Sequence, residues 1–258
     1  MVKFTYSTHK KNYKEYELDL LGVEGPHKQT ISSYRFWDEH IKQNAFKNDG
    51  DIFEFGVYRG NSLITAALIL KELNSKKKLY GFDTFEGFPS FSKFDDLNQF
   101  KKNKYFSKKH QNEFKNFLRL KKNLTKNKKF NSSNISTSGD FSKNSYEYVM
   151  EKINYFKLDN VKLIKGEFKN SVPEFFNKNN IKISSCNIDC DLYDGYQLLL
   201  PYVYQNLSKK GYIHLDEYYS LRFPGAKIAT DDFCKKLKIK PKKNLTRKGE
   251  FERYYLTK

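Results

Sequence analysis

Short apolar runs alternate with segments of helical periodicity along this chain, and the alternation constrains its fold more than any other feature. Residues 51–55 and 78–82 have the length of strands, and residues 61–73 between them are apolar on nearly every side, as in a helix packed against a sheet. A strand, a turn containing glycine, a helix and a second strand form the first half of a doubly wound α/β sheet.

The same alternation continues to the carboxyl end. An amphipathic helix is expected from Thr30, on the spacing of Ile31, Tyr34, Trp37 and Ile41. The other expected elements are a helix at 146–156 capped by Asp140 or Ser142, a strand at 161–164, a helix at 172–177, a strand at 183–188, a helix at 194–207 limited or kinked by Pro201, a strand at 211–215 and a helix at 226–237. Residues 238–249 and 251–256 predict two strands around a polar turn, so that the last strand runs antiparallel to the rest.

A lysine-rich stretch interrupts the alternation between residues 86 and 139. Residues 101–129 contain eleven lysines, one arginine and one glutamate, a large share of the formal net charge of +18. Such lysine content is typical of A/T-rich coding, and the alternative is an insert that lies near an anionic substrate. A compact domain rarely holds so long a connection without function or disorder. We therefore expect an N-terminal arm at 1–29 and a single domain at 30–258, with a lysine-rich insert or lid at about 90–139.

Composition excludes several classes of protein. No run approaches the roughly 18 apolar residues that cross a bilayer, and the first ten residues lack the apolar core of a secretory signal. Cys186, Cys190 and Cys234 make no disulfide framework, so a cytoplasmic globular protein is expected. No helix-turn-helix, zinc-finger or RNA-recognition signature accompanies the basic charge, which leaves a nucleic-acid-binding module with a Rossmann-like core as a distant alternative.

Glycines and one acid at the ends of the first two strands favour a nucleoside cofactor. Gly56 and Gly60 follow the first strand and open a helix, and Asp83 ends the second strand, where a carboxylate can accept hydrogen bonds from ribose hydroxyls. The spacing Glu54-x-Gly56-x-x-x-Gly60 differs from the G-x-G-x-x-G fingerprint of dinucleotide-binding proteins. This spacing and the terminal hairpin favour S-adenosylmethionine and a Rossmann-like seven-stranded class I methyltransferase sheet over an NAD enzyme.

Acids at the ends of the fourth and fifth strands favour a hard divalent cation. Asp189, Asp216 and Glu217 offer oxygen ligands without clustered histidines or thiolates, which suits Mg²⁺, Mn²⁺ or Fe²⁺ better than Zn²⁺. The alternative to a cation site is that the side chain of Asp191 or of Glu217 points into solvent. We interpret His214 as a core residue or as a neighbour of the metal ligands, rather than as a metal ligand itself. Cys186 and Cys190 are interpreted as small core residues.

Five motifs in order resemble those of the macrocin O-methyltransferase (TylF-type) family, which comprises class I, metal-dependent enzymes that methylate sugar hydroxyls with S-adenosylmethionine. The matching stretches are residues 50–60 (GDIFEFGVYRG), 83–89 (DTFEGFP), 165–173 (KGEFKNSVP), 188–193 (IDCDLY) and 211–218 (GYIHLDEY), followed by Pro224-Gly225.

The resemblance implies a role for each matching residue. It makes Glu54, Gly56, Val57, Tyr58 and Gly60 the loop at the methionine end of the cofactor, Asp83 the ribose ligand, Gly166 and Glu167 the adenine contact, Asp189, Asp216 and Glu217 the metal ligands, and Asp189 also the general base. Several positions depart from the family pattern. Glu217 stands where a second aspartate is usual, Glu167 replaces a common tryptophan, and Gly195-Tyr196 replace small hydroxyl residues. The lysine-rich insert has no clear family equivalent.

The acceptor is the least constrained part of the prediction, because folds and families host many substrates. The A/T-biased composition favours a nucleotide-linked sugar or a surface-polysaccharide (capsule) precursor, whose diphosphate the insert would meet. The alternatives are a natural-product sugar, a catechol or another small hydroxylated metabolite. A homodimer is a further expectation.

Overall fold

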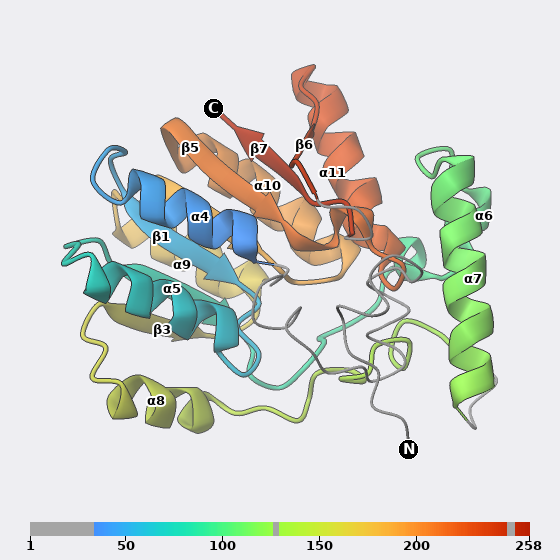
Figure 1. Cartoon of the computed structure of the whole chain (residues 1–258), viewed down its shortest axis with the longest axis horizontal. Coiled ribbons are helices and arrows are strands. Elements are labelled where there is room, and N and C mark those ends of the chain that lie inside the picture. Colours follow the sequence, from blue (N-terminus) through green and yellow to red (C-terminus); the bar gives the residue numbers. More distant parts are fainter. Residues whose placement is uncertain (1–33, 126–128, 247–250) are drawn as a thin grey trace, which may run out of the picture.

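The computed structural model describes residues 34–125, 129–246 and 251–258, and their centre is one seven-stranded sheet (Figure 1). The strand order is β3-β2-β1-β4-β5-β7-β6; β1 to β5 are parallel, and β7 pairs with β5 antiparallel. The strands are β1 (Asp51–Phe55), β2 (Leu79–Asp83), β3 (Val161–Lys165), β4 (Ile183–Ile188), β5 (Leu207–Leu215), β6 (Lys242–Lys243) and β7 (Tyr254–Thr257). The predicted class I methyltransferase sheet with its terminal antiparallel hairpin is confirmed.

Helices cover both faces of the sheet because successive strand residues point to opposite sides. Ile52 packs into a core with α4 (Arg35–Asn44), α5 (Asn61–Glu72) and α8 (Tyr146–Tyr155). Phe53 packs into the core on the other face, which contains side chains of α9 (Phe168–Lys178), α10 (Tyr193–Asn206) and α11 (Pro224–Leu237). Both central positions are at most 1% exposed, so the middle strands are buried on both faces as a parallel sheet requires.

One expected helix cap is wrong, and one proline does not limit its helix. Ser145, rather than Asp140 or Ser142, caps α8, and its hydroxyl accepts a hydrogen bond from the backbone N–H of Tyr148. Pro201 does not end α10, which continues to Asn206. Leu199, Leu200 and Val203, on either side of the proline, are fully buried, so tertiary packing holds the helix together across the missing backbone donor.

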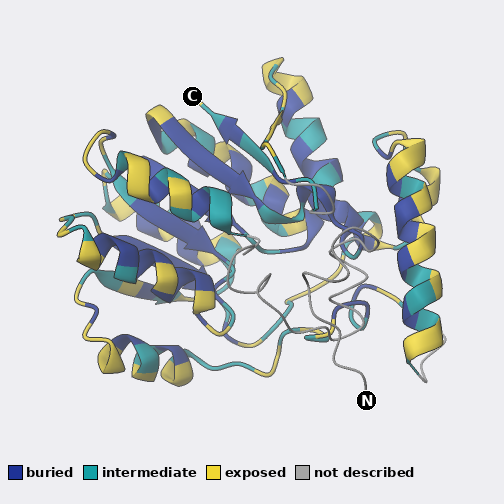
Figure 2. Ribbon diagram, viewed as in Figure 1, coloured by how far each residue is buried: buried dark blue, intermediate teal, exposed yellow. Residues whose placement is uncertain are grey.

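The lysine-rich insert is folded rather than a featureless connection. It contains the short helices η1 (Lys93–Asp95) and α6 (Gln99–Lys102) and the 17-residue helix α7 (Lys108–Leu124). Ser107 caps α7, and its hydroxyl accepts a hydrogen bond from the His110 N–H. Figure 2 shows α7 with a buried and an exposed side, and His110, Phe114 and Phe117 lie on the buried one. The helical spacing of these three residues is present in the sequence, but the many lysines around them led to the prediction of an insert without a helix.

Asp95 fixes the start of the insert to the core. Its side chain is 1% exposed and accepts hydrogen bonds from the backbone N–H groups of Ser92 and Tyr193, each at 2.8 Å. A Cβ atom at Gly225 would lie 2.0 Å from Oδ1 of Asp95, so the glycine of the Pro224-Gly225 pair makes room for this carboxylate.

We expect Asp95→Ala to lower the free energy of unfolding by about 2–4 kcal/mol, because it leaves two backbone donors without their acceptor. Urea denaturation measures this change. The matched control is Asp96→Ala, at an exposed neighbouring position, which should change stability by less than about 1 kcal/mol. Equal effects of the two substitutions would contradict the anchoring role.

Among the described residues, no helix combines the length and the apolar character that crossing a membrane would need. The predicted arm at 1–29 lies outside the described residues, as does the start of the first predicted helix.

Candidate active site

A cavity of about 360 Å³ opens at the carboxyl ends of the parallel strands. In open α/β sheets this edge is where ligands bind. The predicted site residues that line the cavity are Gly56, Val57, Tyr58, Asp83, Glu167, Asp189, Asp216 and Glu217. The structure thus brings together groups at the carboxyl ends of five strands, β1 to β5.

The loop after β1 is held open by backbone geometry and by one carboxylate. Gly56 has φ +93°, and a Cβ there would lie 1.8 Å from the carbonyl oxygen of Asp189, so β1 and β4 approach too closely for any other residue. Oδ2 of Asp83 accepts hydrogen bonds from the N–H groups of Val57 and Tyr58 at 2.7 and 2.8 Å, and Oδ1 accepts one from Phe85 at 2.7 Å. Asp83 therefore orders two loops at the cavity wall.

Three predicted cofactor residues lie outside the cavity lining. Glu54 is fully buried, and its Oε1 accepts hydrogen bonds from Ser62 Oγ at 2.6 Å and Asn187 Nδ2 at 2.8 Å. Burial raises the pKa of Glu54 to about 8, so the carboxyl group is mostly protonated at neutral pH. A Cβ at Gly60 would lie 2.8 Å from Val149, which shows that this glycine serves the packing of α8. Gly166 has φ +144° in the turn after β3.

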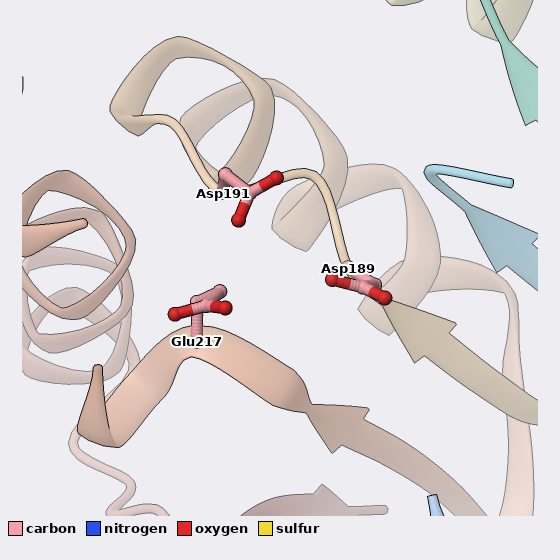
Figure 3. Close-up of side chains that lie close together, drawn as sticks. All are labelled: Asp189, Asp191 and Glu217. Carbon is pink, nitrogen blue, oxygen red and sulfur yellow. The ribbon is translucent and has the colours of Figure 1, made fainter. Parts of the chain in front are cut away.

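Three carboxylates gather at one end of the cavity (Figure 3). Asp189, Asp191 and Glu217 each place one oxygen within 4.8 Å of the other two, and they come from the ends of β4 and β5. Asp191 is only 5% exposed and has φ +61°, a left-handed conformation that aspartate tolerates better than most residues. The expectation left open for Asp191 and Glu217, that either points into solvent, does not hold. We call these three residues the acid cluster.

The acid cluster is electrostatically unfavourable without a counter-charge. Burial, followed by the charges of Asp216 and Asp191, raises the pKa of Asp189, and burial followed by Glu217 raises the pKa of Asp191. Burial and then Asp216 raise the pKa of Glu217 to about 7. Crowded carboxylates of this kind bind protons or a cation to relieve their repulsion.

Asp216 lines the cavity but is not part of the acid cluster. Its Oδ1 lies 3.6 Å from Nε2 of His214, beyond hydrogen-bond length, and neither atom has a hydrogen-bond partner among the described residues. His214 is fully buried, as the sequence interpretation expected. The acid cluster therefore differs from the metal ligands predicted from the sequence, Asp189, Asp216 and Glu217, because it contains Asp191 in place of Asp216.

Tyr34 lies in the candidate site, although the sequence analysis predicted it only as an apolar position of an amphipathic helix. Its hydroxyl donates a 2.6 Å hydrogen bond to Oδ2 of Asp189. Burial, then the charges of Asp189 and Asp216, raises the pKa of Tyr34, so the phenol stays protonated and acts as a donor at neutral pH. No sequence motif surrounds this tyrosine, because the contact joins positions 155 residues apart.

Aromatic rings form the wall of the cavity next to the acid cluster. Phe88 lies 5.0 Å from Phe141 and 5.7 Å from Phe223, between ring centroids, and Tyr58 lies 5.0 Å from Phe141. Among the described residues, the cationic side chains that line the cavity are Arg59 and Arg222, and no lysine of the insert is among them. Residues 87–89, just before the insert, and residues 136–138, at its end, line the cavity together with Phe141, whereas no residue of α7 does.

Comparisons with known proteins agree with this geometry. Residues 35–129 and 120–251 match the family model for macrocin O-methyltransferase (TylF). The solved structure of CalS11, a calicheamicin methyltransferase, aligns with a TM-score of 0.64 at 20% identity, covering 97% of this chain and 89% of the other. The O-methyltransferase NovP aligns with a TM-score of 0.58 at 20% identity, covering 86% and 78%. At such identities the structures show a shared fold, and a search of curated protein sequences found no match. The family model covers most of the chain, and the protein is therefore an O-methyltransferase that belongs to the macrocin O-methyltransferase (TylF) family.

Proposed function

We propose that this enzyme transfers a methyl group from S-adenosylmethionine to a sugar hydroxyl at a divalent-metal site, with a nucleotide-linked sugar or a surface-polysaccharide precursor as acceptor. The observation that carries the proposal is the acid cluster beside the glycine-containing loop, inside one cavity at the edge of the sheet. Residues 30–258 act in it as one domain, with the insert as a lid.

The residues present fit a hard divalent cation. The candidate ligands Asp189, Asp191 and Glu217 are all carboxylates, and their oxygens are close enough to share one ion. Hard divalent cations prefer oxygen ligands of this kind. Asp216, whose Oδ1 has no hydrogen-bond partner within the described part of the chain, is the fourth candidate at the same edge. When bound, the cation stabilises the negative charge that develops on the hydroxyl oxygen of the acceptor.

The lining residues at the ends of β1, β2 and β3 fit the methyl donor. The loop at residues 56–58 and the carboxylate of Asp83 lie where a nucleoside binds in this fold, and Glu167 and Phe168 form the wall next to them. We propose that Glu54 and Gly60 support this loop from below, since their contacts are with the core, and that Gly166 shapes the turn after β3.

Asp189 is the group that we assign as general base. Asp189 lines the cavity as part of the acid cluster, and its carboxylate can accept the proton of a hydroxyl bound beside the cluster. With S-adenosylmethionine bound, Asp189 would accept the proton of the acceptor hydroxyl as the hydroxyl oxygen takes the methyl group, and the donor would be released as a neutral thioether.

Arg59 and Arg222 support an anionic acceptor. Both residues line the cavity, and Arg222 lies five residues after Glu217 in the chain. A diphosphate is a natural partner for a guanidinium group. One solved structure of CalS11 is described as a TDP-rhamnose 3'-O-methyltransferase, which adds support for a nucleotide sugar as acceptor here.

The test is a methylation assay with S-adenosylmethionine, Mg²⁺ or Mn²⁺, and a panel of nucleotide sugars, natural-product glycosides and catechols, read by mass spectrometry. We expect one added methyl on a nucleotide sugar, no product in excess EDTA, and recovery on adding back the metal. Full activity in EDTA would remove the metal from the proposal, and methylation restricted to catechols would remove the sugar.

A further inference from the structure

Tyr34 reaches the acid cluster from a part of the chain remote from the strand ends. It stands immediately before α4, and its hydroxyl lies 2.6 Å from Oδ2 of Asp189. Its ring lies 6.5 Å from that of His214, between centroids. The tyrosine also lines the cavity, so its hydroxyl is at the site rather than behind it.

The helix that follows Tyr34 gives the hydroxyl a fixed position. Trp37 and Ile41 of α4 are at most 1% exposed and belong to the core shared with α5. α4 also contacts β4 and β5, the two strands whose ends carry the acid cluster. A donor on such an element is better positioned than one on a loop.

A carboxylate that binds a cation through one oxygen needs its other oxygen held in place. Hydrogen bonds from neighbouring groups to ligating carboxylates orient the ligand, and their loss costs about 10–100-fold in metal affinity. The Tyr34 hydroxyl donates a hydrogen bond of this kind to Oδ2 of Asp189.

We propose that Tyr34 is a positioning residue for metal binding: its hydroxyl holds Oδ2 of Asp189, so that Oδ1 stays available to the cation shared with Asp191 and Glu217. The inference rests on the proposed function, because it requires a cation at the acid cluster. It makes the start of α4 part of the metal site.

The experiment compares Mn²⁺ binding to the full chain and to Tyr34→Phe by isothermal titration calorimetry, without acceptor. The substitution removes one oxygen and keeps the ring, and melting curves recorded without metal check that the fold is retained. We expect the affinity for Mn²⁺ to fall about 10–100-fold. The matched control is Tyr155→Phe, at a tyrosine that is 81% exposed and outside the cavity lining, which should bind Mn²⁺ like the original chain.

A second measurement separates positioning from a general structural defect. Methyl transfer by Tyr34→Phe should need about 10–100-fold more Mn²⁺ for half-maximal activity. At saturating Mn²⁺ the rate should recover, with an unchanged KM for S-adenosylmethionine. Tight Mn²⁺ binding by the original chain and an affinity within twofold for Tyr34→Phe would overturn the role of Tyr34 alone. Absence of Mn²⁺ binding to the original chain would instead overturn the metal site itself.

Discussion

Replacing Asp189 by asparagine should lower kcat by at least about 1,000-fold. The substitution keeps the size of the side chain and an oxygen for the 2.6 Å hydrogen bond from Tyr34, but it removes the proton acceptor and one charge of the acid cluster. A general base alone contributes about 10²–10⁴-fold. The rate is measured as methyl transfer to whichever nucleotide sugar the original enzyme methylates.

Two measurements make this result specific. Binding of S-adenosylmethionine to Asp189→Asn, followed by calorimetry, should stay within a few-fold of the original value, because the cofactor loop at residues 56–58 is intact. Asp159→Asn, at an exposed position before β3, is the matched control and should retain full activity. More than a tenth of the original kcat in Asp189→Asn would exclude Asp189 as the base.

We expect Gly56→Ala to lower the free energy of unfolding by about 3–5 kcal/mol, combining the strain of a left-handed backbone with overpacking. The added Cβ would lie 1.8 Å from the carbonyl oxygen of Asp189, and this oxygen belongs to backbone that cannot rotate away. Since both the cofactor loop and the base would move, methyl transfer should also be lost. Urea denaturation and the methylation assay measure the two effects.

Gly139→Ala separates the clash from the backbone strain. Gly139 also has a positive φ, +66°, but a Cβ there meets no atom within 4 Å. We expect this control to cost about 1 kcal/mol, the penalty of a left-handed alanine alone. Equal destabilisation by the two substitutions would show that the contact between β1 and β4 does not determine the residue at position 56.

The parts of the molecule that depend on local patterns could be predicted from the sequence. The strands at 51–55 and 183–188 have the bounds that their apolar runs indicated. Because parallel strands end at one edge, Asp83, Asp189 and Glu217 were placed together correctly. The family and the enzyme class followed from these strand-end motifs and agree with the family model.

The parts that depend on contacts between distant segments could not be predicted. Tyr34 and Asp189 meet only because α4 packs across β4. The side chain of Asp191 points into the cavity because Asp191 itself has a left-handed backbone conformation. The spacing of residues in the sequence does not indicate such a conformation. The family motif predicts that Glu54 contacts the cofactor, yet its carboxyl group is buried and accepts hydrogen bonds from Ser62 and Asn187.

The lysine-rich insert contacts the rest of the domain before, along and after α7. Asp95 holds the incoming segment against α10 and α11, and residues 136–141 return to the cavity wall after α7. The intervening helix α7 is not independent of the sheet edge. Tyr219 donates a 2.8 Å hydrogen bond to Glu113 of α7, and Nε2 of His110 lies 2.6 Å from the carbonyl oxygen of Ser220. A rearrangement of the insert would therefore be transmitted to the end of β5, two residues from Glu217.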